Sequence, residues 1–159
     1  MVVAFNLSNK LPLTNGEACK ALKDLLINYI KKNCPDIDVV VGLEARGFLF
    51  NFLIASELGI GCVPIRKEGK LPGECYTVEY VKEYGSDKFQ IQKNALKPGA
   101  KALIIDDLLA TGGTLKAAGE LIEKCGAKVV KAITIMELPE LEGRKKVNFE
   151  VHSFLNYDA

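Results

Sequence analysis

Two short runs of aliphatic residues constrain the fold of this chain most. The stretch IDVVVGL (37–43) is a continuous β-branched run, and KALIID (101–106) is a second apolar run that stops at two adjacent acids, Asp106 and Asp107. Unbroken apolar runs are typical of strands buried on both faces, as in parallel sheets covered by helices on each side. We therefore expect both runs to form central strands of one sheet.

Helical and strand-like patterns alternate along the rest of the chain. Segments with helical character are 16–32, 48–59 and 113–126. Further strand-like segments are 61–67, 127–138 and 149–154. Residues 76–92 alternate on both sides of Tyr84-Gly85-Ser86-Asp87, which predicts an antiparallel hairpin turning at 84–87. The order predicts one α/β domain over 1–159, with a parallel sheet flanked by helices and an inserted hairpin.

Bulk composition excludes several classes of function. The 21 Lys and Arg nearly balance the 20 Asp and Glu, so the chain lacks the basic field of a nucleic-acid binder. No apolar stretch approaches the ~20 residues that span a bilayer, and the N-terminus lacks the pattern of a secretory signal. Five cysteines without CxxC spacing fit reduced thiols, and a single histidine rules out an imidazole metal cluster. We expect a cytoplasmic protein that binds neither nucleic acid nor membrane and has no protein-held metal cluster.

Polar turns follow both central strands. One is 44–47 (EARG) and the other is 106–114 (DDLLATGGT). Ligands of open α/β sheets bind beyond the carboxyl ends of the strands, near a topological switch point. The two turns are therefore expected to meet at one site.

The second turn has the composition of a phosphate site. Gly112 and Gly113 allow a close backbone approach, Thr111 and Thr114 offer hydroxyls, and a helix should begin at about Gly113. The two acids before it would repel a phosphate unless they face something else. Ribose hydroxyls can donate hydrogen bonds to paired carboxylates, which would also stabilise a sugar that becomes cationic. The alternative, an acid pair holding Mg²⁺ in a nucleotide hydrolase, requires a GxxxxGK[ST] loop, and the sequence has none.

The stretch LIIDDLLATGGT closely resembles the motif that binds 5-phosphoribosyl-1-pyrophosphate (PRPP) in type I phosphoribosyltransferases. VVGLEARGFLF, IRKEGKLPGE, EYGSDKFQIQKNAL and MELPELEGRKK look like the adenine phosphoribosyltransferases within that family, chiefly the eukaryotic cytosolic ones. The resemblance covers the chain from about residue 36 to the C-terminus. It implies the type I phosphoribosyltransferase fold, with Asp106 and Asp107 on the ribose and the 5'-phosphate held by Ala110, Thr111, Gly112, Gly113 and Thr114.

The resemblance also implies a pyrophosphate site and a catalytic lid. The pyrophosphate-binding residues that it implies are Glu44, Ala45, Arg46, Lys67, Lys70 and Tyr84. Residues 68–92 correspond to a flexible loop and hairpin that closes over PRPP and carries Glu83, which would act with Asp106 and Asp107 as a catalytic residue. Arg46 would present its fork of donors to anionic oxygens.

The N-terminal part departs from the family pattern. Relatives carry a hood over the adenine with a segment like FPxxGxxFxDI, whereas this sequence starts at MVVAFNLS, so we expect residues 1–15 to form a shortened hood. Val3 falls where relatives contact adenine through the backbone. Phe5 stands where many relatives have arginine, and its ring could stack on a purine.

Taken together, the resemblance implies an enzyme that converts adenine and PRPP to AMP and pyrophosphate, as a homodimer with Mg²⁺ carried mainly by PRPP oxygens. Two alternatives remain open. A shortened hood would suit a non-catalytic PRPP sensor or a disabled paralogue. An enzyme for hypoxanthine or guanine would keep the chemistry, but oxopurine enzymes usually carry a lysine where this chain reads TIMELPELEGRKK.

Overall fold

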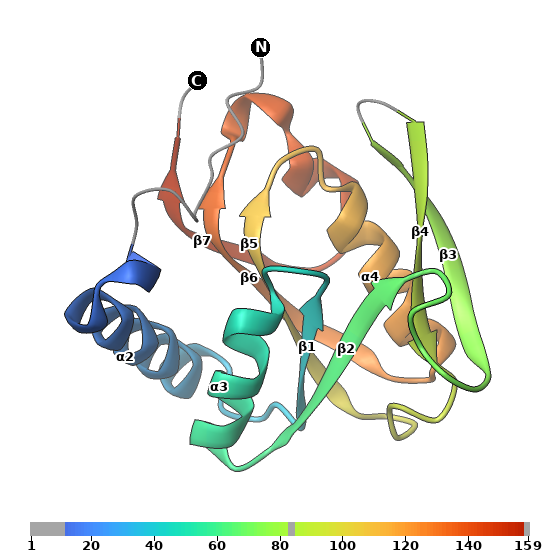
Figure 1. The fold of residues 1–159 in the computed structure, drawn as a ribbon, viewed down its shortest axis with the longest axis horizontal. Coiled ribbons are helices and arrows are strands. Elements are labelled where there is room, and N and C mark those ends of the chain that lie inside the picture. The colour runs from blue at the N-terminus through green and yellow to red at the C-terminus, as the bar shows by residue number, and fades with distance from the viewer. Residues whose placement is uncertain (1–11, 83–84, 158–159) are drawn as a thin grey trace.

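A seven-stranded sheet forms the centre of the molecule, in the order β3-β4-β2-β1-β5-β6-β7 (Figure 1). The computed structural model describes residues 12–82 and 85–157. The strands are β1 (Val39–Leu43), β2 (Gly61–Lys67), β3 (Cys75–Lys82), β4 (Gly85–Gln92), β5 (Lys101–Leu109), β6 (Lys128–Glu137) and β7 (Val151–Asn156). Strands β2, β1, β5, β6 and β7 run parallel, whereas β4 pairs antiparallel with β2 and β3. The expected α/β fold is confirmed, with a mixed rather than purely parallel sheet.

Three α-helices and three short 3₁₀ helices complete the described fold. They are η1 (Pro12–Thr14), α2 (Gly16–Asn33), α3 (Phe48–Leu58), α4 (Gly113–Lys124), η2 (Pro139–Leu141) and η3 (Gly143–Lys146). α2 begins where the Asn15 side chain accepts a hydrogen bond from the backbone N of Ala18 at 3.0 Å, a standard N-cap. α3 ends at Gly59, whose φ of 69° suits glycine. No helix in the described part of the chain is long and apolar enough to cross a membrane.

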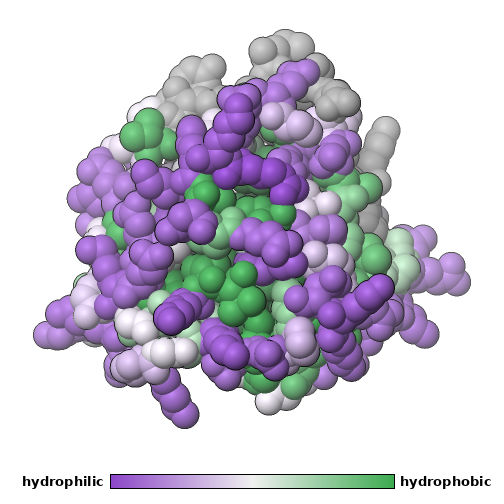
Figure 2. All heavy atoms as spheres, turned by 180° about the vertical axis from the view of Figure 1, so that it is seen from behind, coloured by the Kyte–Doolittle hydropathy of each residue, from purple (hydrophilic) through white to green (hydrophobic). Residues whose placement is uncertain are grey.

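The helices cover the two faces of the sheet and create two hydrophobic cores. On one face α2 and α3 pack over Val40, Leu103 and Ile105. On the other face α4 and the β3–β4 hairpin pack over Val41 and Ile104. Because successive residues of a strand point to opposite faces, the continuous apolar runs of β1 and β5 serve both cores at once. Seen from behind, the surface is largely hydrophilic, with apolar residues gathered near its centre (Figure 2).

Two boundaries differ from the sequence prediction. β5 does not stop at the acid pair but continues to Leu109, paired with β6 beyond both acids. The hairpin strands pair as far as Lys82 and Gly85, so Ser86 and Asp87 lie within β4 rather than in the turn. Both errors arise because polar residues suggest a turn. Here the polar residues continue a strand, since the backbone of the adjacent strand pairs with theirs.

Candidate active site

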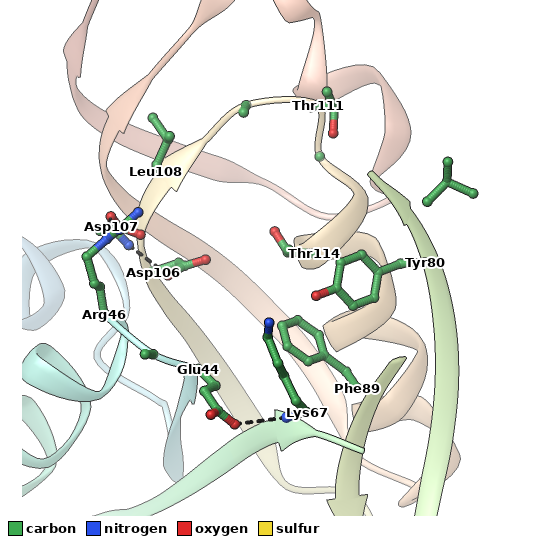
Figure 3. Close-up of a pocket in the computed structure, with 14 residues that line it drawn as sticks. Glu44, Arg46, Lys67, Tyr80, Phe89, Asp106, Asp107, Leu108, Thr111 and Thr114 are labelled. Carbon is green, nitrogen blue, oxygen red and sulfur yellow. Dashed lines mark hydrogen bonds and ion pairs between the residues drawn. The ribbon is translucent and has the colours of Figure 1, made fainter. Parts of the chain in front are cut away.

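A cavity of about 770 Å³ opens beyond the carboxyl ends of β1 and β5 (Figure 3). It is lined by both polar turns that the sequence singled out. The predicted site residues that line it are Glu44, Ala45, Arg46, Lys67, Asp106, Asp107, Ala110, Thr111, Gly112 and Thr114. Segments more than fifty residues apart in the sequence therefore form one site, as the strand-end argument predicts.

Two of the described residues predicted for the site are not among those that line the cavity. Gly113 begins α4 and Lys70 lies in the loop after β2, and neither is among the residues that line the cavity. The backbone carbonyl of Lys70 accepts a hydrogen bond from Nη1 of Arg66 at 3.2 Å. The predicted adenine residues Val3 and Phe5, and the hairpin residues Glu83 and Tyr84, lie outside the described residues.

Four lining residues were not predicted: Tyr80, Val81, Phe89 and Leu108. Tyr80 on β3 and Phe89 on β4 are buried, and their ring centroids lie 4.6 Å apart. Both belong to the face of the hairpin that packs on the α4 side of the sheet. The alternation of apolar residues in YTVEYV was the signal that could have identified this inward face. The hairpin thus contributes an apolar wall to the cavity.

The two side chains of the acid pair point in different directions. Asp107 lies beside Arg46, whereas Asp106 points toward Thr114 and Tyr80 (Figure 3). Both aspartates are buried. The backbone N of Asp107 donates to Oδ1 of Asp106 at 2.9 Å. Burial, and then the adjacent Asp107 carboxylate, raise the pKa of Asp106 well above its usual value.

Each cation in the cavity is held by a carboxylate. Nε of Arg46 donates to Oδ2 of Asp107 across the gap between the two turns (Figure 3). Nζ of Lys67 lies 3.2 Å from Oδ2 of Asp87 on β4. Arg46 and Lys67 are each 48% exposed, so an anion entering the cavity can reach both. An anionic ligand would take the place of Asp107 and Asp87 as the partner of these two cations.

Glu44 fixes the geometry of the first turn. Its Oε2 accepts hydrogen bonds from the backbone N of Lys67 at 2.9 Å and from Nε of Arg66 at 3.2 Å. Burial alone would raise the pKa of Glu44, but the Lys67 amide and the Arg66 guanidinium together hold it below its usual value. The peptide bond between Glu44 and Ala45 is cis. Glu44 therefore binds the end of β2 as a carboxylate rather than facing the cavity as a free base.

The turn expected to bind phosphate, residues 110–114 and here named the phosphate loop, runs from the end of β5 into the first turn of α4. Gly112 is the N-cap residue of α4 and has a φ of 79°, a conformation that favours glycine. Thr111 and Thr114 line the cavity beside it. The first backbone N–H groups of a helix have no partner within the helix, so this end of α4 can bind an anion.

The carboxylates of the cavity suit a hard cation that brings its own ligands. Among the described residues no group of three or more His, Cys, Asp and Glu is arranged to hold a metal. Asp106 and Asp107 nevertheless place buried carboxylates at the cavity wall. Mg²⁺ is commonly bound by one or two carboxylates together with waters and substrate phosphates, and this donor set fits that pattern.

Comparison with known proteins gives consistent matches. Residues 13–155 match the phosphoribosyl transferase domain family. The adenine phosphoribosyltransferase of Drosophila pseudoobscura pseudoobscura is 54% identical over 145 residues, which cover 91% of this chain and 80% of that protein. That of Clostridium botulinum strain Alaska E43 is 47% identical over 145 residues, covering 91% and 83%.

Solved structures resemble the fold equally well. Adenine phosphoribosyltransferase of Saccharomyces cerevisiae, crystallised with adenine and an imino-altritol bisphosphate, has a TM-score of 0.88 at 46% identity, covering 91% of this chain and 83% of that one. The Trypanosoma brucei enzyme, in complex with AMP, pyrophosphate and ribose-5-phosphate, has a TM-score of 0.84 at 27% identity, covering 91% and 67%.

Proposed function

This chain belongs to the adenine phosphoribosyltransferases of the phosphoribosyl transferase family, and we propose that it transfers the phosphoribosyl group of PRPP to adenine. The bond between C1' and the pyrophosphate breaks as N9 of adenine bonds to C1', and N9 loses its proton. The products are AMP and pyrophosphate. The observation that carries this proposal is that one cavity brings together a helix N-terminus, an acid pair and two cations.

The acid pair is assigned to the ribose. The 5'-phosphate binds the phosphate loop through the N–H groups at the start of α4 and the hydroxyls of Thr111 and Thr114. The ribose hydroxyls then face Asp106 and Asp107. Positive charge that develops on the sugar as pyrophosphate leaves is stabilised by these carboxylates, which burial keeps away from water.

Arg46 and Lys67 are assigned to the leaving pyrophosphate, together with the backbone of Ala45. Both cations exchange a carboxylate partner for phosphate oxygens when PRPP binds. Glu44 acts by holding the turn rather than by touching the anion, because a carboxylate facing pyrophosphate would repel it. Lys70 and Tyr84 remain predicted pyrophosphate ligands. Mg²⁺ bound to PRPP would supply further positive charge to the leaving group, and Asp106 and Asp107 are the residues that would help to hold it.

The lid and the base site are assigned by resemblance. Glu83 directly follows Lys82, the last residue of β3. We assign it the role of accepting or orienting the N9 proton once the hairpin has closed over the substrates and excluded water. Val3 and Phe5 are assigned to adenine.

We also propose an oligomeric state and a cellular location for the protein. We propose a homodimer through the outer face of α3, where Leu49, Phe52 and Leu53 are exposed. This helix directly follows the pyrophosphate-binding turn, so a partner there would support the site. We propose a cytoplasmic location because all five cysteines are free thiols, which suits a reducing compartment.

The test is AMP formation from PRPP and Mg²⁺ with adenine, hypoxanthine or guanine in parallel. Turnover with adenine alone is the expected outcome. Turnover with an oxopurine would refute the base assignment. If no base gave turnover while calorimetry still detected PRPP binding, the catalytic proposal would fail and a PRPP sensor would replace it.

A further inference from the structure

An ion pair outside the cavity joins the end of β6 to the segment that follows it. Glu137 ends β6 and is only 4% exposed. Nε of Arg144, in η3, donates to Oε1 and Oε2 of Glu137 at 2.7 and 2.8 Å, and Nη2 also donates to Oε2. A guanidinium that donates several hydrogen bonds to one carboxylate has a fixed orientation, unlike a lysine ammonium.

The same guanidinium is anchored to β7. Nη1 of Arg144 donates to the backbone carbonyl of Val151, and Nη2 donates to Oγ of Ser153 at 3.3 Å. Ser153 is in turn hydrogen-bonded to Thr134 of β6, with 2.7 Å between the two hydroxyl oxygens. Arg144 is therefore tied to two neighbouring strands of the central sheet, so its backbone has little freedom to move.

The residue before Arg144 rests directly on the phosphate loop. A Cβ atom at Gly143 would lie 2.2 Å from the carbonyl oxygen of Ala110 and 2.9 Å from the backbone N of Gly112. A Cβ atom at Gly112 would lie 2.3 Å from the carbonyl oxygen of Gly143. The two backbones thus pack with no room for a methyl group between them, and the position of Gly143 limits the position of the loop.

We propose that Glu137 and Arg144 are positioning residues for the phosphate loop, holding Gly143 against it so that its N–H groups are preorganised for the 5'-phosphate. The inference rests on the proposed function for the identity of that phosphate. Neither residue lines the catalytic cavity, so neither would contact a phosphate bound there. Displacing binding groups by about 1 Å costs up to about a hundredfold in rate, which gives such a support a functional effect.

The test compares two ligands that occupy opposite sides of the cavity. Dissociation constants for ribose-5-phosphate and for pyrophosphate are measured by calorimetry on the full chain. Arg144→Met should weaken ribose-5-phosphate binding by at least about tenfold, while the pyrophosphate constant changes by less than about twofold. Arg144→Lys keeps the charge without the fork and should recover part of the loss. In turnover, the KM for PRPP should rise more than kcat falls.

A matched control separates positioning from general stability. Lys131 is also buried on β6 and pairs with Glu150 at 2.7 Å, but it lies toward the opposite end of the strand. Lys131→Met should lower the melting temperature without changing either dissociation constant selectively. If Arg144→Met does not fold, the double variant Glu137→Gln/Arg144→Met also removes the buried Glu137 charge and takes its place.

Two results would overturn the inference. One is unchanged ribose-5-phosphate binding in folded Arg144→Met or the double variant. The other is an equal loss for both ligands. Failure of the proposed function would look different, because wild-type protein would then form no AMP from adenine even if the two dissociation constants behaved as expected.

Discussion

At the scale of single residues, Asp106 and Asp107 are neighbours in the chain with different surroundings. Asp107 binds Arg46, whereas Asp106 shares its surroundings with the hairpin residue Tyr80. Burial, followed by the carboxylate of Asp87, raises the pKa of Tyr80 well above its usual value. The phenol therefore stays neutral and acts as a hydrogen-bond group in the cavity wall.

Asp107→Asn should reduce kcat/KM by about a hundredfold or more, because a group that stabilises charge in the transition state typically contributes on this scale. The fold should persist, since Arg46 is half exposed and can be solvated. Steady-state AMP formation and circular dichroism would measure both effects. Asp38→Asn is the control, because Asp38 accepts a hydrogen bond from the backbone N of Lys101 at 2.8 Å at the opposite end of β5. Wild-type turnover in Asp107→Asn would contradict the assignment.

Asp106 should make stability depend on pH in a defined direction. Its pKa in the folded protein is raised above the usual value of 3.8, so the folded state binds the proton more tightly than the unfolded state. Protonated Asp106 therefore contributes fully to the free energy of unfolding below about pH 3.8, and this contribution is lost as the pH rises through the pKa of the folded protein. Asp106→Asn should melt at a higher temperature than wild type at pH 7, and the difference should shrink toward pH 4. A difference that grew on acidification would show that the sign is wrong.

The acid pair and the phosphate loop could be predicted from sequence because their residue types have narrow uses. Gly112 with its positive φ, and the threonines beside it, appear in the cavity as expected. Tyr80 and Phe89 could not be assigned in the same way, because an inward aromatic residue on a hairpin looks like any core residue. Only the packing of the hairpin over α4 places these rings in the cavity wall.

At the scale of elements, the hairpin is linked to the pyrophosphate site through Asp87. This residue of β4 binds Lys67 of β2, so the hairpin competes with pyrophosphate for the same ammonium group. Asp87→Asn should tighten pyrophosphate binding by up to about fivefold, the range expected for a half-exposed ion pair. Calorimetry would measure the change. Glu68→Gln breaks the Glu68–Lys88 pair between the same segments and should have no effect. Weaker binding in Asp87→Asn would mean that Asp87 orients Lys67 instead.

The start of α3 depends on the absence of a side chain at Gly47. A Cβ atom there would lie 2.6 Å from the backbone N of Leu43 and 2.7 Å from the carbonyl oxygen of Ile105. Gly47→Ala should destabilise the protein by about 1–3 kcal/mol, as overpacking against backbone generally does. Denaturant unfolding would measure this. Gly61→Ala serves as the control, because its Cβ would meet only Val39 at 3.8 Å. Equal stability of the two variants would contradict the expectation.

At this scale, sequence reasoning failed to predict which residues at the strand ends pair with a neighbouring strand. The end of β5 was placed at Asp106 because the apolar run stops at the two acids, yet the pairing continues to Leu109 next to Glu137. Likewise the polar residues Ser86 and Asp87 suggested a turn, but they pair with Val81 and Tyr80. Which polar residues find partners is decided by neighbouring strands, and a single sequence does not contain that information.

At the scale of the whole molecule, the proposed homodimer can be tested by changing the exposed apolar face of α3. Phe52 is 71% exposed and has Leu49 and Leu53 beside it on the helix. Phe52→Asp should convert a species of about twice the 17.4 kDa chain mass into one of a single chain mass, and should lower activity by disturbing the preceding turn. Sedimentation equilibrium would measure the mass. Leu155→Asp, on the outer strand β7, should leave the mass unchanged. A wild-type monomer with full activity would refute the dimer.

The close contact between Gly112 and Gly143 also bears on protein engineering. A short phosphate-binding turn is attractive to transplant into another scaffold, because residues 110–114 are few and contiguous. In this molecule the turn rests on a carbonyl that arrives from beyond the next strand, with no space between the two for even one carbon atom. A graft of the turn alone would leave that support behind. A graft would therefore need both the turn and the segment around Gly143 that packs against it. The residues between them only need to hold the two segments in contact.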